Sequence, residues 1–258
     1  MYKCGIIIPL YKYDLYDYEI MSLKRIIKLY KDSEQYKIMF LCDYNFDIDK
    51  LLDKYAIDEF VYSYYNFDKQ FFKSKIEYNL LCLNLETYTN LIGTYEYLLI
   101  YQLDAYIFDD QLEYWINKDY DYIGGYEGVF GWHLIYDHLN KIFNDENIRN
   151  NKNIIIMNGG FSLRKVNYCI DVIQKLPHDF NGYLWGFQRP IIFEDMVYSI
   201  YNTNHPVSAI DAIKFSCTQF YYPFNFSINE FKYPFGTHQF QKHTDLYNLV
   251  KEFDKNNQ

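Results

Sequence analysis

The chain has 258 residues, an apolar content of 50% and an aromatic content of 21%, which exclude extensive disorder and allow one large α/β domain or two small ones. Its net charge of −9 argues against general binding of nucleic acid or anionic lipid, because both require clustered positive charge. An acidic protein that binds an anionic nucleotide needs local positive charge from a metal ion, a helix N-terminus or a few basic side chains.

Cysteine usage and hydropathy indicate which cellular compartment to expect for the protein. The five cysteines are scattered and never form a CxxC pair, which argues against a disulfide framework or a zinc site and indicates a reducing, cytoplasmic environment. The apolar stretch at residues 5–8 is too short for a signal peptide, and no run approaches roughly 18 apolar residues. We therefore expect neither a secretory leader nor a transmembrane helix.

The first third of the chain alternates between predicted strands and helices. The pattern predicts strands at residues 2–10, 37–42 and 59–64, with helices at 19–30 and 51–55. This alternation favours a parallel sheet with right-handed crossovers. The following segment, residues 67–89, carries aromatic and aliphatic residues at helical spacing and is predicted to be one helix.

Residues 95–108, YEYLLIYQLDAYIF, are expected to form the central strand. Their apolar middle is interrupted by one ionisable group, Asp104, and such a run is typical of a strand that is buried on both faces. An unpaired carboxylate there would cost several kcal/mol, so Asp104 either faces a site at the strand's carboxyl end or has a partner. Ligands of open α/β sheets bind at that edge, and a lone aspartate is also a common turn former or helix cap.

The second half of the chain continues the alternation less clearly. We predict strands at residues 120–123 and 154–157, a helical turn at 112–115, helices at 162–176 and 194–202, and an extended piece at 209–215. No repeat or linker is visible, so we expect one domain over residues 1–258, with a flexible tail from about residue 250 to residue 258.

The segment NGGFSLR has a physical logic of its own. Asn158-Gly159-Gly160 ends a predicted strand, where glycines permit positive φ and close approach of a ligand to the backbone. Ser162 would then cap the next helix, whose free N–H groups could face an anion. The alternative is a tight β–α turn without a ligand.

Six blocks in series resemble glycosyltransferases of the GT-A type, and more closely a family of glycosyltransferase-like domains that share these blocks. They span nearly the whole chain in order: Ile8 to Lys12, YLLIYQLDAYIF from Tyr97, Tyr120 to Gly124, NGGFSLRKV from Asn158, Glu194-Asp195, and Pro234 to His238. The resemblance implies a single GT-A-like α/β domain that transfers a sugar from a nucleoside-diphosphate donor, usually with Mn²⁺ or Mg²⁺.

The resemblance also implies a metal and donor site. GT-A folds carry an Asp-x-Asp motif at the end of a central strand, and here Asp104 is the only acid that remains, with Gln102 in the first position. His238 matches a late histidine that completes the metal site or touches the diphosphate. The donor-binding residues that the resemblance implies are Pro9, Tyr11, Lys12, Asp43, Gln102, Asp104, Ala105, Asn158, Gly159 and Gly160.

Glu194-Asp195 lies where an acid acts as general base in inverting relatives, and Asp195 is the preferred candidate over Glu194. A helix cap with a charge partner is the structural alternative for this pair. Trp185 and Arg189 are candidate acceptor contacts in a polar loop. The acceptor itself could be a surface polysaccharide, a lipid-linked glycan or a protein.

Two other functional classes stay open. A catalytically silent nucleotide-sugar-binding module would account for the missing first acid of the Asp-x-Asp pair. A nucleotidyltransferase would share the phosphate handling, but such enzymes usually have a glycine-rich basic loop near the N-terminus, and residues 9–14 contain no glycine.

Overall fold

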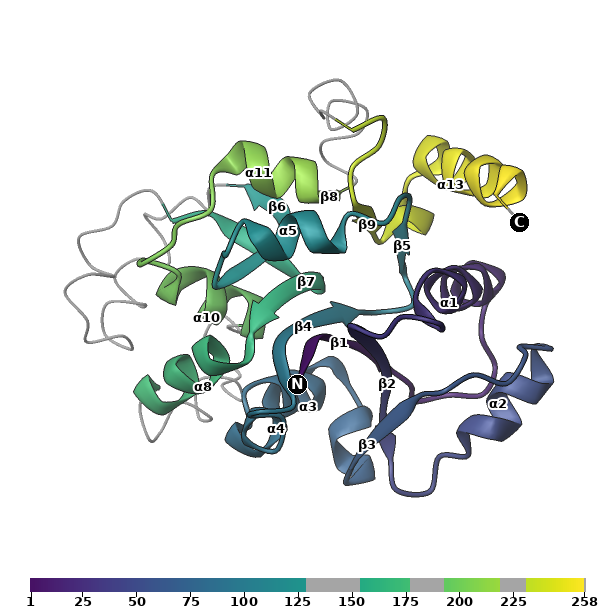
Figure 1. The fold of residues 1–258 in the computed structure, drawn as a ribbon, viewed down its shortest axis with the longest axis horizontal. Coiled ribbons are helices and arrows are strands. Elements are labelled where there is room, and N and C mark those ends of the chain that lie inside the picture. The colour runs from purple at the N-terminus through teal and green to yellow at the C-terminus, as the bar shows by residue number, and fades with distance from the viewer. Residues whose placement is uncertain (129–153, 177–192, 219–230, 258) are drawn as a thin grey trace.

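The computed structural model describes residues 1–128, 154–176, 193–218 and 231–257. The strands of its larger sheet are β1 (Tyr2–Pro9), β2 (Tyr36–Asp43), β3 (Ser63–Phe67), β4 (Tyr95–Tyr101), β6 (Tyr122–Gly128) and β7 (Ile156–Lys165). Their order in the described part of the chain is β3-β2-β1-β4-β7-β6 (Figure 1). The first four strands are parallel, whereas β7 runs antiparallel to both of its neighbours. The predicted α/β fold with a mainly parallel central sheet is confirmed.

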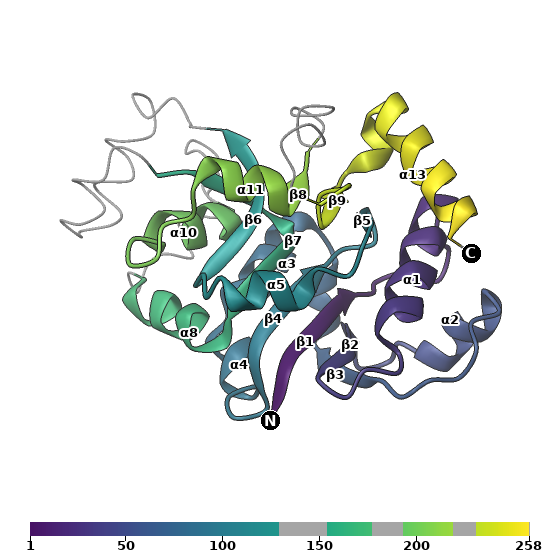
Figure 2. The same cartoon turned by 45° about the horizontal axis from the view of Figure 1, so that its top comes forward.

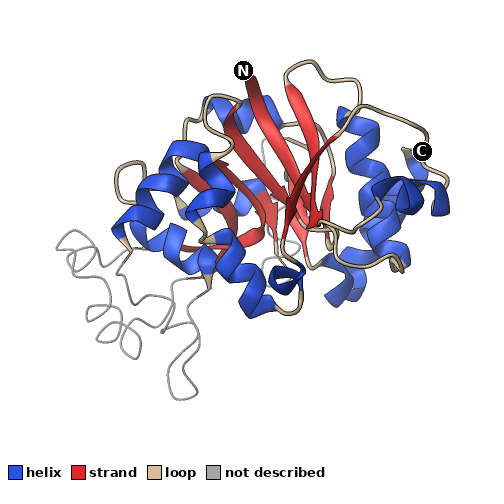
Figure 3. Cartoon of the chain, turned by 90° about the horizontal axis from the view of Figure 1, so that it is seen from below, coloured by secondary structure: helices blue, strands red, loops and turns tan. Residues whose placement is uncertain are grey.

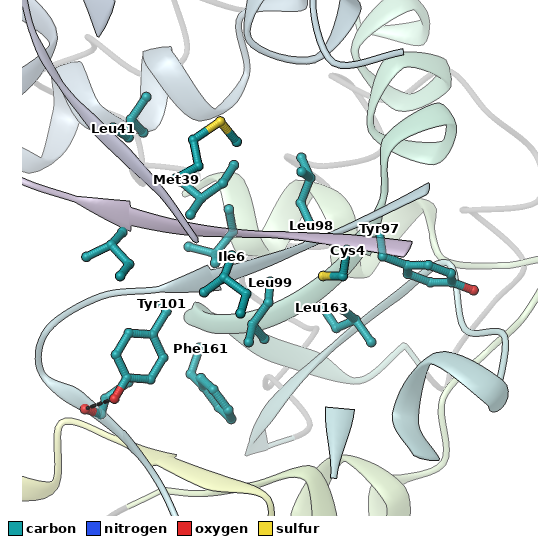
Figure 4. Packing of buried hydrophobic residues seen from close by; sticks show 14 of the residues in the cluster. Cys4, Ile6, Met39, Leu41, Tyr97, Leu98, Leu99, Tyr101, Phe161 and Leu163 are labelled. Carbon is teal, nitrogen blue, oxygen red and sulfur yellow. Dashed lines mark hydrogen bonds between the residues drawn. The ribbon is translucent and has the colours of Figure 1, made fainter. Parts of the chain in front are cut away.

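The middle of the larger sheet is apolar on both faces. Ile6 on β1 pairs with Ile38 on β2 and Leu99 on β4, and all three side chains are buried on one face, while the next residue of β1, Ile7, is buried on the other. Figure 4 shows these strands from close by, with Leu163 and Phe161 of β7 continuing the same layer. A strand of this kind needs a helix on each face, because no polar side of the sheet can meet water.

Helices cover both sides of the sheet (Figure 3). They are α1 (Asp17–Tyr30), α2 (Ile48–Lys54), α3 (Lys75–Cys82), α4 (Leu85–Thr89), α5 (Leu112–Asn117), α8 (Val166–Lys175), α10 (Glu194–Tyr201), α11 (Ala209–Phe215) and α13 (Thr244–Asn256). The last helix lies beside α1, where Lys28 Nζ donates to Asn257 O at 2.6 Å (Figure 2). None of the helices in the described ranges is long and apolar enough to span a membrane.

The segment predicted as one helix over residues 67–89 is divided into three. A short 3₁₀ helix, η1 (Lys69–Phe72), is followed by α3 and α4. The Ser74 and Asn84 side chains accept hydrogen bonds from the first turns of α3 and α4, at 3.1 Å and 3.0 Å. The aromatic spacing therefore predicts helix correctly, but the capping residues Ser74 and Asn84 divide the segment.

The stretch expected to form one central strand is broken next to Asp104. After β4, residues 102–104 turn, and Ala105 N donates to Gln102 O at 2.8 Å. The chain then continues as β5 (Ala105–Ile107) in a second sheet of order β5-β9-β8, with β9 (Gly236–His238) and β8 (Ser216–Cys217). Asp104 thus lies at the carboxyl end of β4, between two sheets.

The prediction that Asn158 to Gly160 end a strand and that Ser162 begins a helix is wrong. β7 continues through Lys165, with Ser162 paired to Ile100 of β4 and Gly124 of β6. The Ser162 hydroxyl donates to Gly159 O at 2.8 Å instead of capping a helix. The polar side chains of this segment are satisfied inside the protein, so their polarity did not mark a surface turn.

Two further expectations fail in the C-terminal part. Residues 209–215, expected to be extended, form α11, because the Ser208 hydroxyl caps the helix by accepting from Asp211 N at 3.0 Å. The tail expected to be flexible from about residue 250 lies in α13 as far as Asn256. Val250 and Phe253 anchor this helix in a small core with Tyr106 and Phe108.

Arg25 joins the N-terminal helix to the strand that follows Asp104. Arg25 is 8% exposed, and its guanidinium donates from Nε to Ile107 O at 3.0 Å and from Nη2 to Phe108 O. We expect Arg25→Met to lower the free energy of unfolding by about 2–3 kcal/mol, since two buried carbonyls lose a charged donor. Urea denaturation measures this loss, and Lys24→Met, an exposed neighbour on α1, is the control. Equal effects of the two substitutions would contradict this role for Arg25.

Candidate functional site

Asp104 and His238 face each other where the two sheets meet. Ala105 pairs with His238 across β5 and β9, which places Asp104 Oδ1 3.1 Å from His238 Nε2. Burial raises the pKa of the Asp104 carboxyl, but the neighbouring His238, Gln241 and Lys242 outweigh it and hold this pKa below its ordinary value. Asp104 is therefore a carboxylate at neutral pH, at the end of the central strand.

The glycine pair of β7, Gly159 and Gly160, lies between the Asp104–His238 pair and a second charged cluster. A Cβ on Gly160 would lie 2.2 Å from His238 Nε2, and a Cβ on Gly159 would lie 2.2 Å from Glu194 Oε1. Because neighbouring residues of a strand face opposite sides, only glycine at both positions allows these groups to approach the strand from each side.

On one side of β7, Glu194 forms a buried ion pair. Both carboxylate oxygens contact the Arg164 guanidinium, at 2.8 Å to Nη1 and 3.1 Å to Nη2. Arg164 is 0% exposed and also donates to Gly159 O at 3.1 Å. Glu194 thus has the charge partner at a helix start that was the structural alternative to a catalytic role. Asp195 takes no part in this bidentate pair.

Asp195 is next to this ion pair and is only partly exposed. Its carboxylate accepts from Gly159 N at 3.3 Å and from Met196 N at 2.8 Å. Burial, followed by the negative charge of Glu194, raises the pKa of Asp195 to about 7. The group can therefore exchange a proton near neutral pH, as a general acid or base must.

Asn158 connects the glycine pair to another acid, Glu127. The Asn158 side chain accepts from Gly160 N at 2.8 Å and donates to Glu127 Oε1 at 3.1 Å. Burial raises the pKa of Glu127, and Asn158, His238 and Lys242 offset part of this effect. Glu127 was not recognised from the sequence, because a glutamate after a short strand carries no local signal.

A cleft of about 480 Å³ opens beside Asp104. Several predicted donor-site residues line it: Pro9, Tyr11, Lys12, Gln102 and Asp104. Tyr11 is 60% exposed, so its ring is available for contact with a ligand. Asp43 does not line the cleft, and its carboxylate instead accepts from Asn45 N at 2.9 Å in a local turn. Ala105 is fully buried beneath Asp104, and Trp185 and Arg189 lie outside the described residues.

The cleft also contains lysines that sequence reasoning missed. Lys73 and Lys75 flank the N-cap of α3, Lys242 follows His238 by four residues, and together with Lys12 they line the same space. Lys12 additionally pairs with Glu19 at 2.8 Å. The sequence Lys73-Ser74-Lys75 at a helix start could have been noticed, but its proximity to Lys242 depends on the fold. The acidic chain thus has the local positive charge expected for binding an anion.

The residues that would hold a metal ion are few. Within the described ranges no cluster of three or more His, Cys, Asp or Glu side chains is suitably placed. Asp104 Oδ1 and His238 Nε2 are nevertheless both buried and face each other at 3.1 Å. A carboxylate oxygen and an imidazole nitrogen in this state fit a divalent cation, so the pair is compatible with Mn²⁺ or Mg²⁺.

Comparison with known proteins supports the fold. A family model described as "Protein of unknown function (DUF5672)" matches residues 61–238, and a sequence search of curated proteins finds no match. The glycosyltransferase GlyE of Streptococcus pneumoniae TIGR4 aligns with a TM-score of 0.56 and 12% identity over 98% of this chain and 60% of GlyE. The galactosyltransferase LgtC, solved with donor and acceptor sugar analogues, aligns with a TM-score of 0.52 and 11% identity over 98% of this chain and 95% of LgtC. At these identities the likeness shows a shared GT-A glycosyltransferase fold, and this chain spans less than two thirds of GlyE.

The raised pKa of Asp195 predicts a characteristic pH dependence of stability. Between about pH 4 and pH 7 the unfolded chain releases this proton while the folded protein keeps it, so the free energy of unfolding falls as pH rises. Asn cannot titrate. The free energy of unfolding of Asp195→Asn should therefore rise relative to that of the parent protein between about pH 4 and pH 7, and the difference should stay constant above pH 7.

Thermal unfolding at pH 5 and pH 8 measures the effect, with Asp171→Asn as a control on the exposed face of α8. If the difference in melting temperature between parent and Asp195→Asn is the same at both pH values, Asp195 does not have a raised pKa.

Proposed function

The chain belongs to the DUF5672 family, and from that premise we propose that it is a glycosyltransferase, which transfers a sugar from a nucleoside-diphosphate donor to a glycan, lipid-linked or protein acceptor. One observation carries the proposal: Asp104, paired with His238 where Gly160 leaves room for the imidazole, lines a cleft together with four lysines in a chain of net charge −9. A diphosphate is the ligand chemistry that matches lysines, a helix N-terminus and a possible cation site together.

The donor site is assigned by charge and shape. Lys73 and Lys75 at the start of α3, with Lys242 opposite, would contact the phosphate oxygens, and the exposed Tyr11 ring would stack on the base. Asp104 and His238 would hold Mn²⁺ or Mg²⁺, which when bound neutralises charge on the diphosphate. The Asn158, Gly159 and Gly160 segment would lie against the donor sugar.

In the proposed reaction, the acceptor oxygen bonds to the anomeric carbon and the bond from that carbon to the diphosphate breaks. Asp195 takes the proton of the acceptor hydroxyl, and the lysines stabilise the negative charge that develops on the departing diphosphate. Glu194 has a different role: its pairing with Arg164 fixes the start of α10, and its negative charge adds to the effect of burial in raising the pKa of Asp195. Trp185 and Arg189 remain proposed acceptor contacts.

A silent nucleotide-sugar-binding module is the second candidate. It is favoured by Gln102, which stands in the cleft where a first acid of an Asp-x-Asp motif would be. Such a module would bind the donor in the same lysine-lined cleft but would release no sugar. The two candidates therefore share a donor-binding test and differ in turnover.

Donor binding should depend on the lysines of the cleft. We expect UDP or GDP to raise the melting temperature of the parent protein, and Lys73→Ala combined with Lys75→Ala to weaken nucleotide affinity by roughly tenfold or more, as expected when charge-assisted contacts are lost. Lys69→Ala, an exposed lysine on η1 outside the cleft, is the matched control. Calorimetric titration with each nucleoside diphosphate measures these affinities, and no binding by any of them would end both candidate functions.

Turnover should depend on Asp195. We expect the nucleotide affinity of Asp195→Asn to stay within about twofold of that of the parent protein. The rate of sugar transfer, or of donor hydrolysis where no acceptor is present, should fall by about 10²–10⁴-fold. The parent rate should rise with pH and level off above about pH 7, since only the carboxylate accepts a proton. Release of sugar from a panel of nucleotide sugars measures turnover, with Asp171→Asn as control. Loss of nucleotide binding in Asp195→Asn would remove the assignment as base, and no turnover by the parent protein would favour the silent module.

A further inference from the structure

A buried side-chain oxygen close to Asp104 has no hydrogen-bond partner in the part of the chain that the structure describes. Gln241 Oε1 is buried and, in the described part of the chain, accepts no hydrogen bond. Asp104 Oδ1 and His238 Nε2 are also buried, and they face each other at 3.1 Å. The Gln241 amide lies within hydrogen-bonding reach of the Asp104 carboxylate. A buried polar atom without a partner is rare because it loses its hydration without compensation, so Gln241 Oε1, on a side chain that reaches the Asp104 carboxylate, suits the binding of a ligand there.

The distance between Asp104 Oδ1 and His238 Nε2 is suitable for a shared cation. Asp104 Oδ1 and His238 Nε2 are 3.1 Å apart, and both atoms are buried. Two ligands of one octahedral ion, each about 2.1 Å from the metal and at right angles, are about 3 Å apart. The distance therefore matches neighbouring positions of a shared coordination sphere.

The chain turns sharply to bring Gln241 back to Asp104. His238 ends β9, Gln239 adopts a left-handed conformation with φ of 56°, and the 3₁₀ helix η2 (Phe240–Lys242) follows. Gln239 N donates to Asp104 O at 2.8 Å, which fixes the turn to the aspartate backbone. Left-handed backbone at a residue other than glycine costs free energy and is concentrated at functional sites.

We propose that Gln241 Oε1 is the third protein ligand of a divalent cation held by Asp104 and His238. It would replace the first acid of the Asp-x-Asp motif, whose position is occupied by Gln102. The inference rests on the proposed function, because the remaining positions would be filled by the donor diphosphate and water. Half a turn of the Gln241 amide exchanges its nitrogen and oxygen, so the same side chain hydrogen-bonds Asp104 without the ion and ligates the ion when it is bound.

This ligand set has two consequences. One imidazole with two oxygens favours Mn²⁺ or Co²⁺ over Mg²⁺ and Ca²⁺, which prefer oxygen ligands alone. The set has a single negative charge, and the ammonium of Lys242 acts on the same carboxylate. The free cation is therefore attracted weakly, and it binds well only when a diphosphate adds negative charge.

Equilibrium dialysis with Mn²⁺ tests the ligand assignment, with protein-bound manganese measured by atomic absorption in the presence and absence of UDP or GDP. We expect the parent protein to bind Mn²⁺ at least tenfold more tightly with the diphosphate present, and more tightly than Mg²⁺ under the same conditions. Gln241→Ala should weaken diphosphate-dependent Mn²⁺ binding by about tenfold or more. Gln241→Glu, which adds a carboxylate, should tighten Mn²⁺ binding without the diphosphate.

The controls separate this inference from the proposed function. Gln35→Ala changes an exposed glutamine that precedes β2 and should behave as the parent protein. Nucleotide affinity without metal should be the same in Gln241→Ala and the parent, because the lysines provide it. Unchanged Mn²⁺ binding in both Gln241 variants overturns the ligand assignment while leaving the donor site intact. Absence of metal-free nucleotide binding would instead contradict the donor site, and Mn²⁺ binding that survives Asp104→Asn unchanged would exclude this cation site altogether.

Discussion

The candidate site depends on the interruption between β4 and β5. An apolar run with one carboxylate in it cannot remain a single buried strand, because the charge would have neither water nor a partner. The chain resolves this conflict by turning at residues 102–104 and starting β5 in the second sheet, where β9 pairs with it and brings His238 against Asp104. The same turn opens the cleft beside Asp104. The helix that ends the chain, α13, packs its apolar face on Tyr106 and Phe108 and so supports this second sheet.

Two helical segments then connect the cleft to the charged cluster beyond β7. α3 presents Lys73 and Lys75 to the cleft at its N-terminus, and farther along the same helix Asn79 Oδ1 accepts from Glu194 N at 2.7 Å. Glu194 begins α10 and is held by Arg164 from β7. A ligand that orders the start of α3 is therefore linked through one helix to the backbone that positions Asp195. The proposed donor and proton-transfer sites share a rigid support rather than independent loops.

The sequence predicted the parallel half of the sheet, and five of the residues expected to bind a donor line one cleft, whereas the failures near the candidate site have a common physical cause. Strands with apolar runs and the amphipathic helix α1 follow from local patterns, and so does the position of Asp104 at the end of β4. The errors occurred where polar residues are satisfied inside the fold. Ser162 and Arg164 looked like a turn and a helix start, but their partners are Gly159 and Glu194, and the latter lies 30 residues away along the chain. Lys242 and Gln241 carried no local signal, because their importance comes from a turn that returns to Asp104.

The buried ion pair between Arg164 and Glu194 illustrates why a structural group can still influence the chemistry. Such a pair is weak support for stability, since the desolvation of both charges offsets their attraction. The acid of the pair nevertheless acts on its neighbour: burial, followed by the negative charge of Glu194, raises the pKa of Asp195 to about 7. The guanidinium alone would lower it. Arg164 thus holds Glu194 in place beside Asp195 and at the same time limits how far this acid raises the pKa of Asp195.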